Sequence, residues 1–406
     1  MTMRPGTLIA SMCTIEVLGM GAFATFPTLI PQLQLDWGMS NTQAGWVSGI
    51  YFAGYVAAVA LLTALTDRVD ARRVYLFSMF TAAAGAVGFA ALADGIASAA
   101  WWRLVQGIGL AGTYMPGLKM LSDRLPDDLQ SRGTAFYTAS FGIGASVSYY
   151  VSGLVGDALG WRSAFAACAV GPIIALVLAA WLTDRRPHAA QAPDTHLLDF
   201  RPVLGNRPAL GFTLAYTLHN LELFAFRSWI VAFLVFSQSQ QPAGTPGIGW
   251  SAATIAALIN LVGLPSSVIT NELSARFGRQ LTIVAVMLAS ALVGACFGFL
   301  ASSAFWLVVG VAFLYGVTIT ADSATITAGL VRVADPRYKG TTMAMHSVIG
   351  FVGAFVGPIL FGVALDAAGG EIAPHAWGVA FAVMAVLLLG GPLAIAGLVG
   401  FRRRVV

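Results

Sequence analysis

The feature of this chain that most constrains its fold is the placement of its positive charges between long apolar stretches. Of the 22 lysine and arginine residues, 18 lie in alternate gaps between these stretches, and the intervening gaps hold only Arg162. Cytoplasmic loops of membrane proteins carry such an excess of positive charge. The pattern therefore predicts a multi-pass membrane protein whose basic gaps face the cytoplasm.

The composition agrees with a location in lipid. At 58% hydrophobic and 10% charged residues, a chain of 406 residues carries more apolar surface than a soluble domain can bury. The net charge of +4 follows from the basic loops, so we expect no binding of nucleic acid. The cysteines Cys13, Cys168 and Cys296 lack the paired spacing of metal sites and disulfide frameworks. We predict a lipid bilayer as the surroundings, with no resident metal ion and no cofactor.

A transmembrane helix needs roughly 20 mainly apolar residues, and the chain has twelve such windows. They cover residues 7–30, 44–65, 74–93, 99–121, 134–155, 164–181, 210–236, 252–273, 281–300, 305–330, 343–363 and 377–399. An even number of spans places both termini on the same side, and the basic gaps make that side the cytoplasm. The expected location is a bacterial-type inner (plasma) membrane. The first window lacks a small-residue cleavage site, so we interpret it as a span and not as a removable signal peptide.

The longest interior polar stretch divides the chain near its midpoint. It covers residues 183–207 and contains four arginines, two histidines and three prolines. We therefore predict an N-terminal six-helix bundle at residues 1–182, a cytoplasmic linker at 183–207 and a C-terminal six-helix bundle at 208–406.

The two predicted halves carry similar loops. One loop covers residues 63–73, the other covers residues 271–280, and their arginines Arg68 and Arg276 are 208 positions apart, about half the chain. Parallel repeats of this kind are known in transporters, where the substrate site lies near the bilayer midplane between the repeats. The predicted fold is an all-α membrane protein with twelve transmembrane helices in two pseudo-symmetric six-helix bundles.

The first loop resembles the signature of the major facilitator superfamily. The matching positions are Asp67, Arg68, Arg72 and Arg73. The loop departs from the signature at Thr63 and Asp70, where the superfamily has glycine. The segment from Arg103 to Ala111 is similar to the fourth-helix motif of the same superfamily. The resemblance covers the whole chain and implies a monomeric secondary transporter that works by alternating access, and not an enzyme.

The loops at the cytoplasmic helix ends are candidates for a conformational latch. Carboxylates and arginines there can form charge-assisted hydrogen bonds in one conformation and lose them in another. The candidate latch residues are Asp67, Arg68, Arg72, Arg73, Glu272 and Arg276. Since Ala275 occupies the aspartate position of the second copy, any latch there must use Glu272 or be weaker. The alternative is that the arginines only anchor the loops on the positive-inside face.

Apart from Glu272 at the end of the eighth window, six charged residues lie inside the predicted spans, where each is costly unless it is paired or faces a wet cavity. They are Glu16, Arg103, Lys119, Glu222, Arg227 and Asp322. All six fall in spans one, four, seven and ten, which line the central cavity in the resembled superfamily. We predict that the transport chemistry lies among them.

Span seven is the richest in polar side chains. Its residues His219, Glu222 and Phe226 have helical spacing and are expected to share one face, whereas Arg227 is rotated away. Burial favours the protonated form of a carboxyl group, so Glu222 is the leading candidate for carrying a proton. The other proton-coupling candidates are Glu16, Asp322 and His219. The alternative for Glu222 is a permanent ion pair with Arg227 or with a base on another helix.

The predicted substrate-binding residues combine basic groups with polar residues of span seven. They are Arg103, Lys119, Arg227, Tyr216 and Asn220. The basic groups favour an anionic substrate. Arg103 and Lys119 have an alternative role, since each lies near one end of its span and can extend to the interface.

Within the superfamily, the chain is most similar to the group of nitrate/nitrite and cyanate-type permeases. The arginines that the nitrate branch carries on spans two and eight have no counterpart here, so we expect a small organic or inorganic anion moved with protons. One alternative is a drug/proton antiporter, although span five lacks the proline of that branch. Another alternative is a membrane sensor or assembly factor that does not transport.

Small residues recur four positions apart in two spans. Gly107 and Ala111 have this spacing in span four, and Gly353 and Gly357 have it in span eleven. The spacing predicts close packing of helix backbones at both places.

Overall fold

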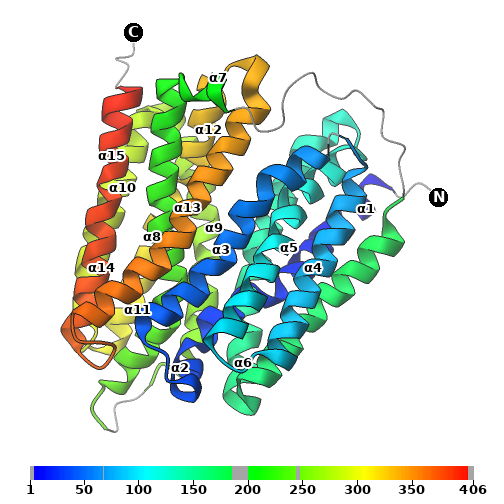
Figure 1. Cartoon of the computed structure of the whole chain (residues 1–406). Coiled ribbons are helices and arrows are strands. Elements are labelled where there is room, and N and C mark those ends of the chain that lie inside the picture. The colour runs from blue at the N-terminus through cyan, green and yellow to red at the C-terminus, as the bar shows by residue number, and fades with distance from the viewer. Residues whose placement is uncertain (1–3, 67, 185–199, 244–246, 401–406) are drawn as a thin grey trace. The chain divides into compact units, whose positions relative to one another are not determined.

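A computed structural model describes residues 4–66, 68–184, 200–243 and 247–400 (Figure 1). These residues form helices and turns and contain no strand, which confirms the predicted all-α class. The helices before the central stretch are α1 (Pro5–Gly19), α2 (Thr25–Trp37), α3 (Asn41–Leu65), α4 (Ala71–Leu92), α5 (Ile96–Ser122) and α6 (Asp127–Leu182). Those after it are α7 (Arg201–Leu204), α8 (Arg207–Ser239), α9 (Ala252–Phe277), α10 (Arg279–Phe297), α11 (Phe305–Ala321), α12 (Ser323–Val333), α13 (Lys339–Ala367), α14 (Pro374–Leu388) and α15 (Gly390–Ala394).

The chain divides into two compact units. The first unit comprises Met1–Gly38 and Ile50–Leu197, and the second comprises Met39–Gly49 and Leu198–Val406.

Ten helical stretches among the described residues are long and apolar enough to cross a membrane. One of them, α6, has 56 residues and contains two of the predicted windows. At about 1.5 Å per residue it is far longer than a bilayer of about 30 Å requires. Gly160 interrupts it with φ of 78°, a backbone conformation that glycine adopts without a side-chain clash. The predicted window at 99–121 lies within α5, which is not among the ten, so the number of twelve spans stays a prediction.

Two predicted spans contain a break. The first span is divided into α1 and α2 by the 3₁₀ turn Met20–Ala22. Pro27 stands at the third position of α2. The first four N–H groups of a helix have no partner within the helix, so a proline without an N–H group is tolerated there and favours a helix start. The tenth span is divided at Asp322, the residue between α11 and α12.

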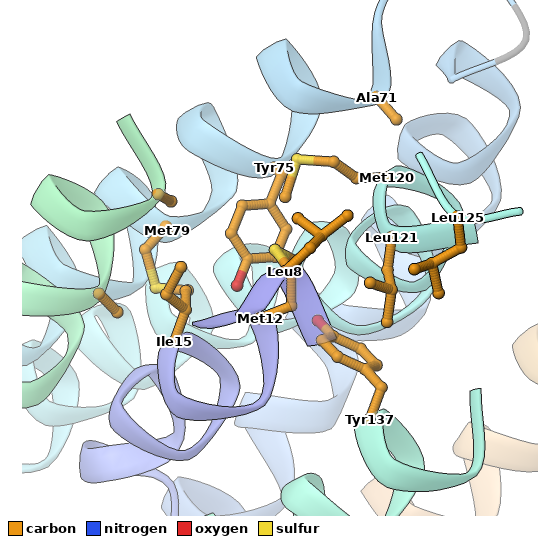
Figure 2. Packing of buried hydrophobic residues seen from close by; sticks show 12 residues of the cluster. Leu8, Met12, Ile15, Ala71, Tyr75, Met79, Met120, Leu121, Leu125 and Tyr137 are labelled. Atoms are coloured by element: carbon orange, nitrogen blue, oxygen red, sulfur yellow. The ribbon is translucent and has the colours of Figure 1, made fainter. Parts of the chain in front are cut away.

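The core of the first unit forms where α1 packs against α6 and where α4 packs against α5. Figure 2 shows one cluster of this core, in which Tyr75 of α4 and Tyr137 of α6 lie on either side of the α1 residues Leu8 and Met12. The prediction of close packing at Gly107 is confirmed, because a Cβ atom there would collide with the carbonyl oxygen of Tyr51 in α3.

The second unit is built around α8, whose side chains are buried along most of its length. Its tightest neighbour is α13. A Cβ atom at Gly353 would collide with the carbonyl oxygen of Thr217, and one at Gly357 with that of Leu221. This confirms the predicted close approach of α13. The helix α8 also contacts α11 and α12, and these contacts bring polar groups from distant parts of the sequence together.

Candidate functional site

The carboxyl group of Glu222 lies in the interior of the second unit, where 1% of the residue is exposed. Ser290 of α10 donates its hydroxyl proton toward this group, with Oγ 3.0 Å from Oε1 and 3.1 Å from Oε2. The hydroxyl of Tyr315 in α11 donates to Oε1 at 2.9 Å. Glu222 therefore interacts with hydroxyl groups, and within the described residues it forms no salt bridge to Arg227 or to another base.

Hydroxyl partners suit a carboxyl group that changes its protonation state. A serine or tyrosine hydroxyl can donate to a carboxylate and can rotate to accept from a carboxylic acid. A lysine or arginine partner can only donate and would hold the group in its charged form. The surroundings of Glu222 therefore satisfy both the charged and the neutral carboxyl group.

An acid–base pair lies one helical turn before Glu222. The Nδ1 atom of His219 is 2.8 Å from Oδ1 of Asp322, and both side chains are almost fully buried. Asp322 occupies the break between α11 and α12, where the chain departs briefly from regular helix. Together with Glu222, the pair places an imidazole and two carboxyl groups in the core of the second unit.

One face of α8 carries these groups, as its helical spacing predicts. His219 contacts Asp322, Glu222 contacts Tyr315, and the ring of Phe226 lies 4.8 Å from that of Tyr315. All three side chains thus meet the segment that contains α11 and its junction with α12. Arg227 lies elsewhere on the helix, with its guanidinium carbon 5.4 Å from the centre of the Phe224 ring.

The first unit holds its own buried carboxyl group at Glu16 of α1, which is 1% exposed. The hydroxyl of Tyr137 lies 2.8 Å from Oε2 of Glu16 and 3.0 Å from the carbonyl oxygen of Thr113. One hydroxyl proton must serve both acceptors. The other oxygen, Oε1, is buried without a hydrogen-bond partner among the described residues.

Arg103 of α5 is a deeply buried basic group, at 1% exposed. Its Nη1 atom donates to Oε1 of Gln106 at 2.9 Å, and its guanidinium carbon lies 4.2 Å from the centre of the Tyr51 ring. Gln106 in turn donates to the carbonyl oxygen of Gly85 at 3.1 Å. Within the described part of the chain, Arg103 forms no salt bridge, and its Nε atom has no hydrogen-bond partner.

The other predicted substrate-binding residues differ in burial and in the kind of partner they contact. Lys119 is partly exposed and lies 3.6 Å from Asp123, one turn later in the chain. Asn220 is buried and donates to the carbonyl oxygen of Gly350 at 3.1 Å. Tyr216 is partly exposed and stacks on His346, with 4.2 Å between the ring centres.

The loop that resembles the superfamily signature makes its contacts within the first unit. Asp67 lies outside the described residues. Arg72 donates from Nε to the carbonyl oxygen of Thr183 at 2.7 Å and from Nη2 to that of Ala180 at 2.7 Å. It thereby satisfies carbonyl groups at the C-terminal end of α6. Asp70 caps α4 and lies 3.6 Å from Arg124. The remaining candidates, Arg68, Arg73, Glu272 and Arg276, are exposed.

Sequence reasoning missed the hydroxyl groups that contact the two glutamates. Tyr137, Ser290 and Tyr315 stand in apolar spans, and each lies far along the chain from its carboxyl partner. The signal that could have found the tyrosines is chemical, because a buried tyrosine hydroxyl usually requires a partner.

With this geometry described, the chain can be compared with known proteins. A family model described as Major Facilitator Superfamily matches residues 12–319 and 240–405. The chain belongs to the Major Facilitator Superfamily. The resemblance inferred from the loop and fourth-span motifs is therefore confirmed.

Relatives of this chain are named for different substrates. The multidrug resistance protein Stp of Mycobacterium tuberculosis is 30% identical over 161 residues, which cover 37% of this chain and 29% of Stp. The sialic acid transporter NanX of Escherichia coli is 20% identical over 234 residues, which cover 57% of this chain and 55% of NanX. The chain thus spans less than a third of Stp and little more than half of NanX.

A solved structure supports the superfamily fold over nearly the whole chain. It is the crystal structure of a bacterial homolog to the human lysosomal transporter Spinster, in an inward-facing and unoccupied conformation. The two structures align with a TM-score of 0.76 at 15% sequence identity, covering 99% of each chain. This likeness shows a common fold.

Proposed function

We propose that this protein is a secondary active transporter that moves a small anionic solute across the inner membrane together with protons, by alternating access. It is a multi-pass protein with both termini in the cytoplasm, it works as a monomer, and it catalyses no covalent reaction. The observation that carries the proposal is the hydroxyl-bound carboxyl group of Glu222 beside the His219–Asp322 pair.

Proton coupling follows from the partners of Glu222. Because Ser290 and Tyr315 can act as donors or acceptors, the carboxyl group can lose and regain a proton without leaving a buried polar atom unsatisfied. The nearby His219–Asp322 pair offers a second place for a proton in the same unit. Glu222 is the principal carrier in this proposal, with His219 and Asp322 assisting it.

An anionic solute agrees with the buried arginine of the first unit. Arg103 has a desolvated positive charge and no salt bridge within the described residues, so an anion is the natural counter-charge. Arg227 and Lys119 add positive charge, and Tyr216 and Asn220 add polar contacts. The relative NanX is named for an acid, which is consistent with this class of solute.

The loops at the cytoplasmic helix ends act as the latch in this proposal. Arg68, Arg73, Glu272 and Arg276 are exposed and free to change partners between conformations. Arg72 holds the end of α6, which fixes the base of the loop within the first unit.

Drug efflux is the second candidate function. The relative Stp is named for multidrug resistance and shares 30% identity over its matched segment. A drug/proton antiporter would also use a buried glutamate, but it would bind cationic or neutral dyes and would not select small anions.

The test uses the purified full-length protein in liposomes with an imposed pH gradient. A panel of radiolabelled acetate, pyruvate, benzoate, nitrate and cyanate is compared with cationic dyes. We expect gradient-driven accumulation of at least one anion. The Glu222→Gln variant, which mimics the protonated carboxyl group permanently, should lose accumulation about tenfold or more while still exchanging labelled for unlabelled solute.

The matched control for that variant is Asp157→Asn, which neutralises an exposed carboxylate of the first unit. It should accumulate solute like the wild type. Unchanged accumulation by Glu222→Gln would exclude the coupling role, and a wild-type response to dyes alone would favour efflux.

A further inference from the structure

Three aromatic rings form a stack between α8 and α13, and the proposed proton site uses only one of them, that of His219. The Tyr216 ring lies nearly parallel to the His346 ring, at 18° and with 4.2 Å between centres. It also lies nearly parallel to the His219 ring, at 16° and 5.8 Å. We call Tyr216, His219 and His346 the ring stack.

The packing of α13 makes room for this stack. A Cβ atom at Gly350 would collide with the Tyr216 ring, so the tyrosine fits only because that position is glycine. Asn220, one turn after Tyr216, donates to the carbonyl oxygen of Gly350 and fixes the two helices in register. The position of the rings is therefore set by the backbone of both helices.

Each histidine of the stack is bound through one ring nitrogen only. Nδ1 of His219 lies 2.8 Å from Oδ1 of Asp322, as an ion-pair contact, and Nδ1 of His346 lies 3.4 Å from the hydroxyl oxygen of Thr213. Both Nε2 atoms are buried and have no hydrogen-bond partner among the described residues. The two residues are only 1% and 3% exposed.

Two unpartnered imidazole nitrogens in one core are costly unless a ligand or water satisfies them at some stage of the cycle. The negative charge of Asp322 beside Nδ1 favours the His219 tautomer that carries its proton there, which leaves Nε2 able to take up a proton. The Thr213 hydroxyl can donate to Nδ1 of His346 or accept from it, and when it donates, Nε2 of His346 carries the ring proton. Both nitrogens can then donate an N–H group to an acceptor.

We propose that the ring stack is the subsite that binds the oxyanion group of the transported solute, through N–H groups at Nε2 of His219 and His346. The proposal rests on the proposed anion transport and assigns its substrate class, a carboxylate or an inorganic oxyanion. Tyr216, which is partly exposed, connects the buried histidines with the surface of their unit.

An oxyanion and the proton on His219 together leave the net charge of the site unchanged. When His219 takes up a proton at Nε2, it becomes an imidazolium ion whose charge Asp322 already offsets. An oxyanion that accepts from this N–H group therefore binds to the protonated form of His219, whereas Glu222 carries the proton that is coupled to transport. His219 would bind the solute through Nε2 and keep Asp322 through Nδ1.

The experiment compares two replacements of His346 in the full-length protein in liposomes, with the same panel of acetate, pyruvate, benzoate, nitrate and cyanate. His346→Phe keeps an aromatic ring on Tyr216 but has no N–H donor. His346→Gln keeps an N–H donor without the ring. The readout is the half-saturation concentration for the best-transported anion, together with the maximal rate.

We expect His346→Phe to raise the half-saturation concentration about tenfold or more, because a hydrogen bond to a charged group is lost. His346→Gln should stay within about threefold of the wild type, since a donor to the oxyanion is retained. His375→Phe is the matched control, because His375 is exposed at the start of α14 and should bind solute normally. His346→Met is measured in parallel, in case the phenylalanine variant does not fold.

An unchanged half-saturation concentration in the phenylalanine and methionine variants, with an active wild type, would overturn the ring-stack proposal and leave anion transport standing. A wild type that moves none of the oxyanions would overturn both proposals.

Discussion

The buried glutamates of the two units have different surroundings, although each has a tyrosine hydroxyl as a partner. Glu222 has two hydroxyl partners that reach both carboxyl oxygens, and an acid–base pair lies one turn away. Glu16 has one hydroxyl partner, which is also shared with the carbonyl oxygen of Thr113, and its second oxygen is without a partner in the described residues.

The difference indicates which carboxyl group can exchange a proton during a cycle. A charged Glu16 would need stabilisation that one shared hydroxyl cannot supply, so this residue is suited to a permanently neutral, structural role. Glu222 is satisfied in either form. Two residues that look equivalent in the sequence, each a lone acid in an apolar span, are thus expected to have different functions.

The largest expected effect in the second unit comes from breaking the acid–base pair. Asp322→Asn removes the carboxylate that holds His219, and we expect gradient-driven uptake to fall about tenfold or more. His219→Gln should have a similar effect, and the double variant should be no worse than either single one, because the two residues act as one unit. Initial uptake rates measure all three. A double variant whose loss equals the product of the single losses would show that the residues act independently.

The next effect concerns stability in the first unit. Tyr137→Phe removes the hydroxyl that serves Glu16, and leaving a buried group unsatisfied costs about 1–3 kcal/mol. We expect a lower temperature of thermal unfolding for the purified protein. The ratio of proton to solute flux should stay unchanged, since Glu16 does not carry the coupled proton in this account. Combining the change with Glu16→Met, which removes the unsatisfied carboxyl group, should recover part of the lost stability. An altered flux ratio in Tyr137→Phe would contradict the structural role.

The smallest effect is expected at Ser290. Ser290→Ala removes one of two hydroxyl partners of Glu222 and the one that reaches Oε2, but the carboxyl group keeps a partner because Tyr315 still donates to Oε1. The loss in unfolding free energy should be about 0.5–1.5 kcal/mol, the net value of a typical hydrogen bond. Ser290→Thr, which keeps the hydroxyl, is the control. A loss as large as that of Tyr137→Phe would mean that Glu222 depends on one partner as Glu16 does.

Much of the fold could be predicted because lipid leaves a chain few choices. A spanning segment must satisfy its backbone groups internally, so apolar windows such as 210–236 correspond to helices such as α8. The breaks at Met20–Ala22 and at Asp322 were not predicted, since the apolar pattern continues through both. Hydropathy records where lipid is tolerated and does not record where a helix changes direction.

The candidate site could be predicted only in part. Glu16, Glu222 and Asp322 are visible in the sequence because a charge in an apolar span is rare. Their partners are not visible, because hydroxyl groups are common in spans and Tyr315 is 93 positions from Glu222. The pairing of His219 with Asp322 and the stacking of His346 on Tyr216 depend on how α8 packs against α12 and α13, which spacing within one helix does not reveal.

The most direct test of the account is solute-driven proton uptake by liposomes that contain the wild type, Glu222→Gln or Glu16→Gln, measured with an entrapped pH-sensitive dye. The account predicts that the wild type and Glu16→Gln take up protons when an anion gradient is applied, whereas Glu222→Gln exchanges the anion without proton uptake. Proton uptake that persists in Glu222→Gln and disappears in Glu16→Gln would contradict it.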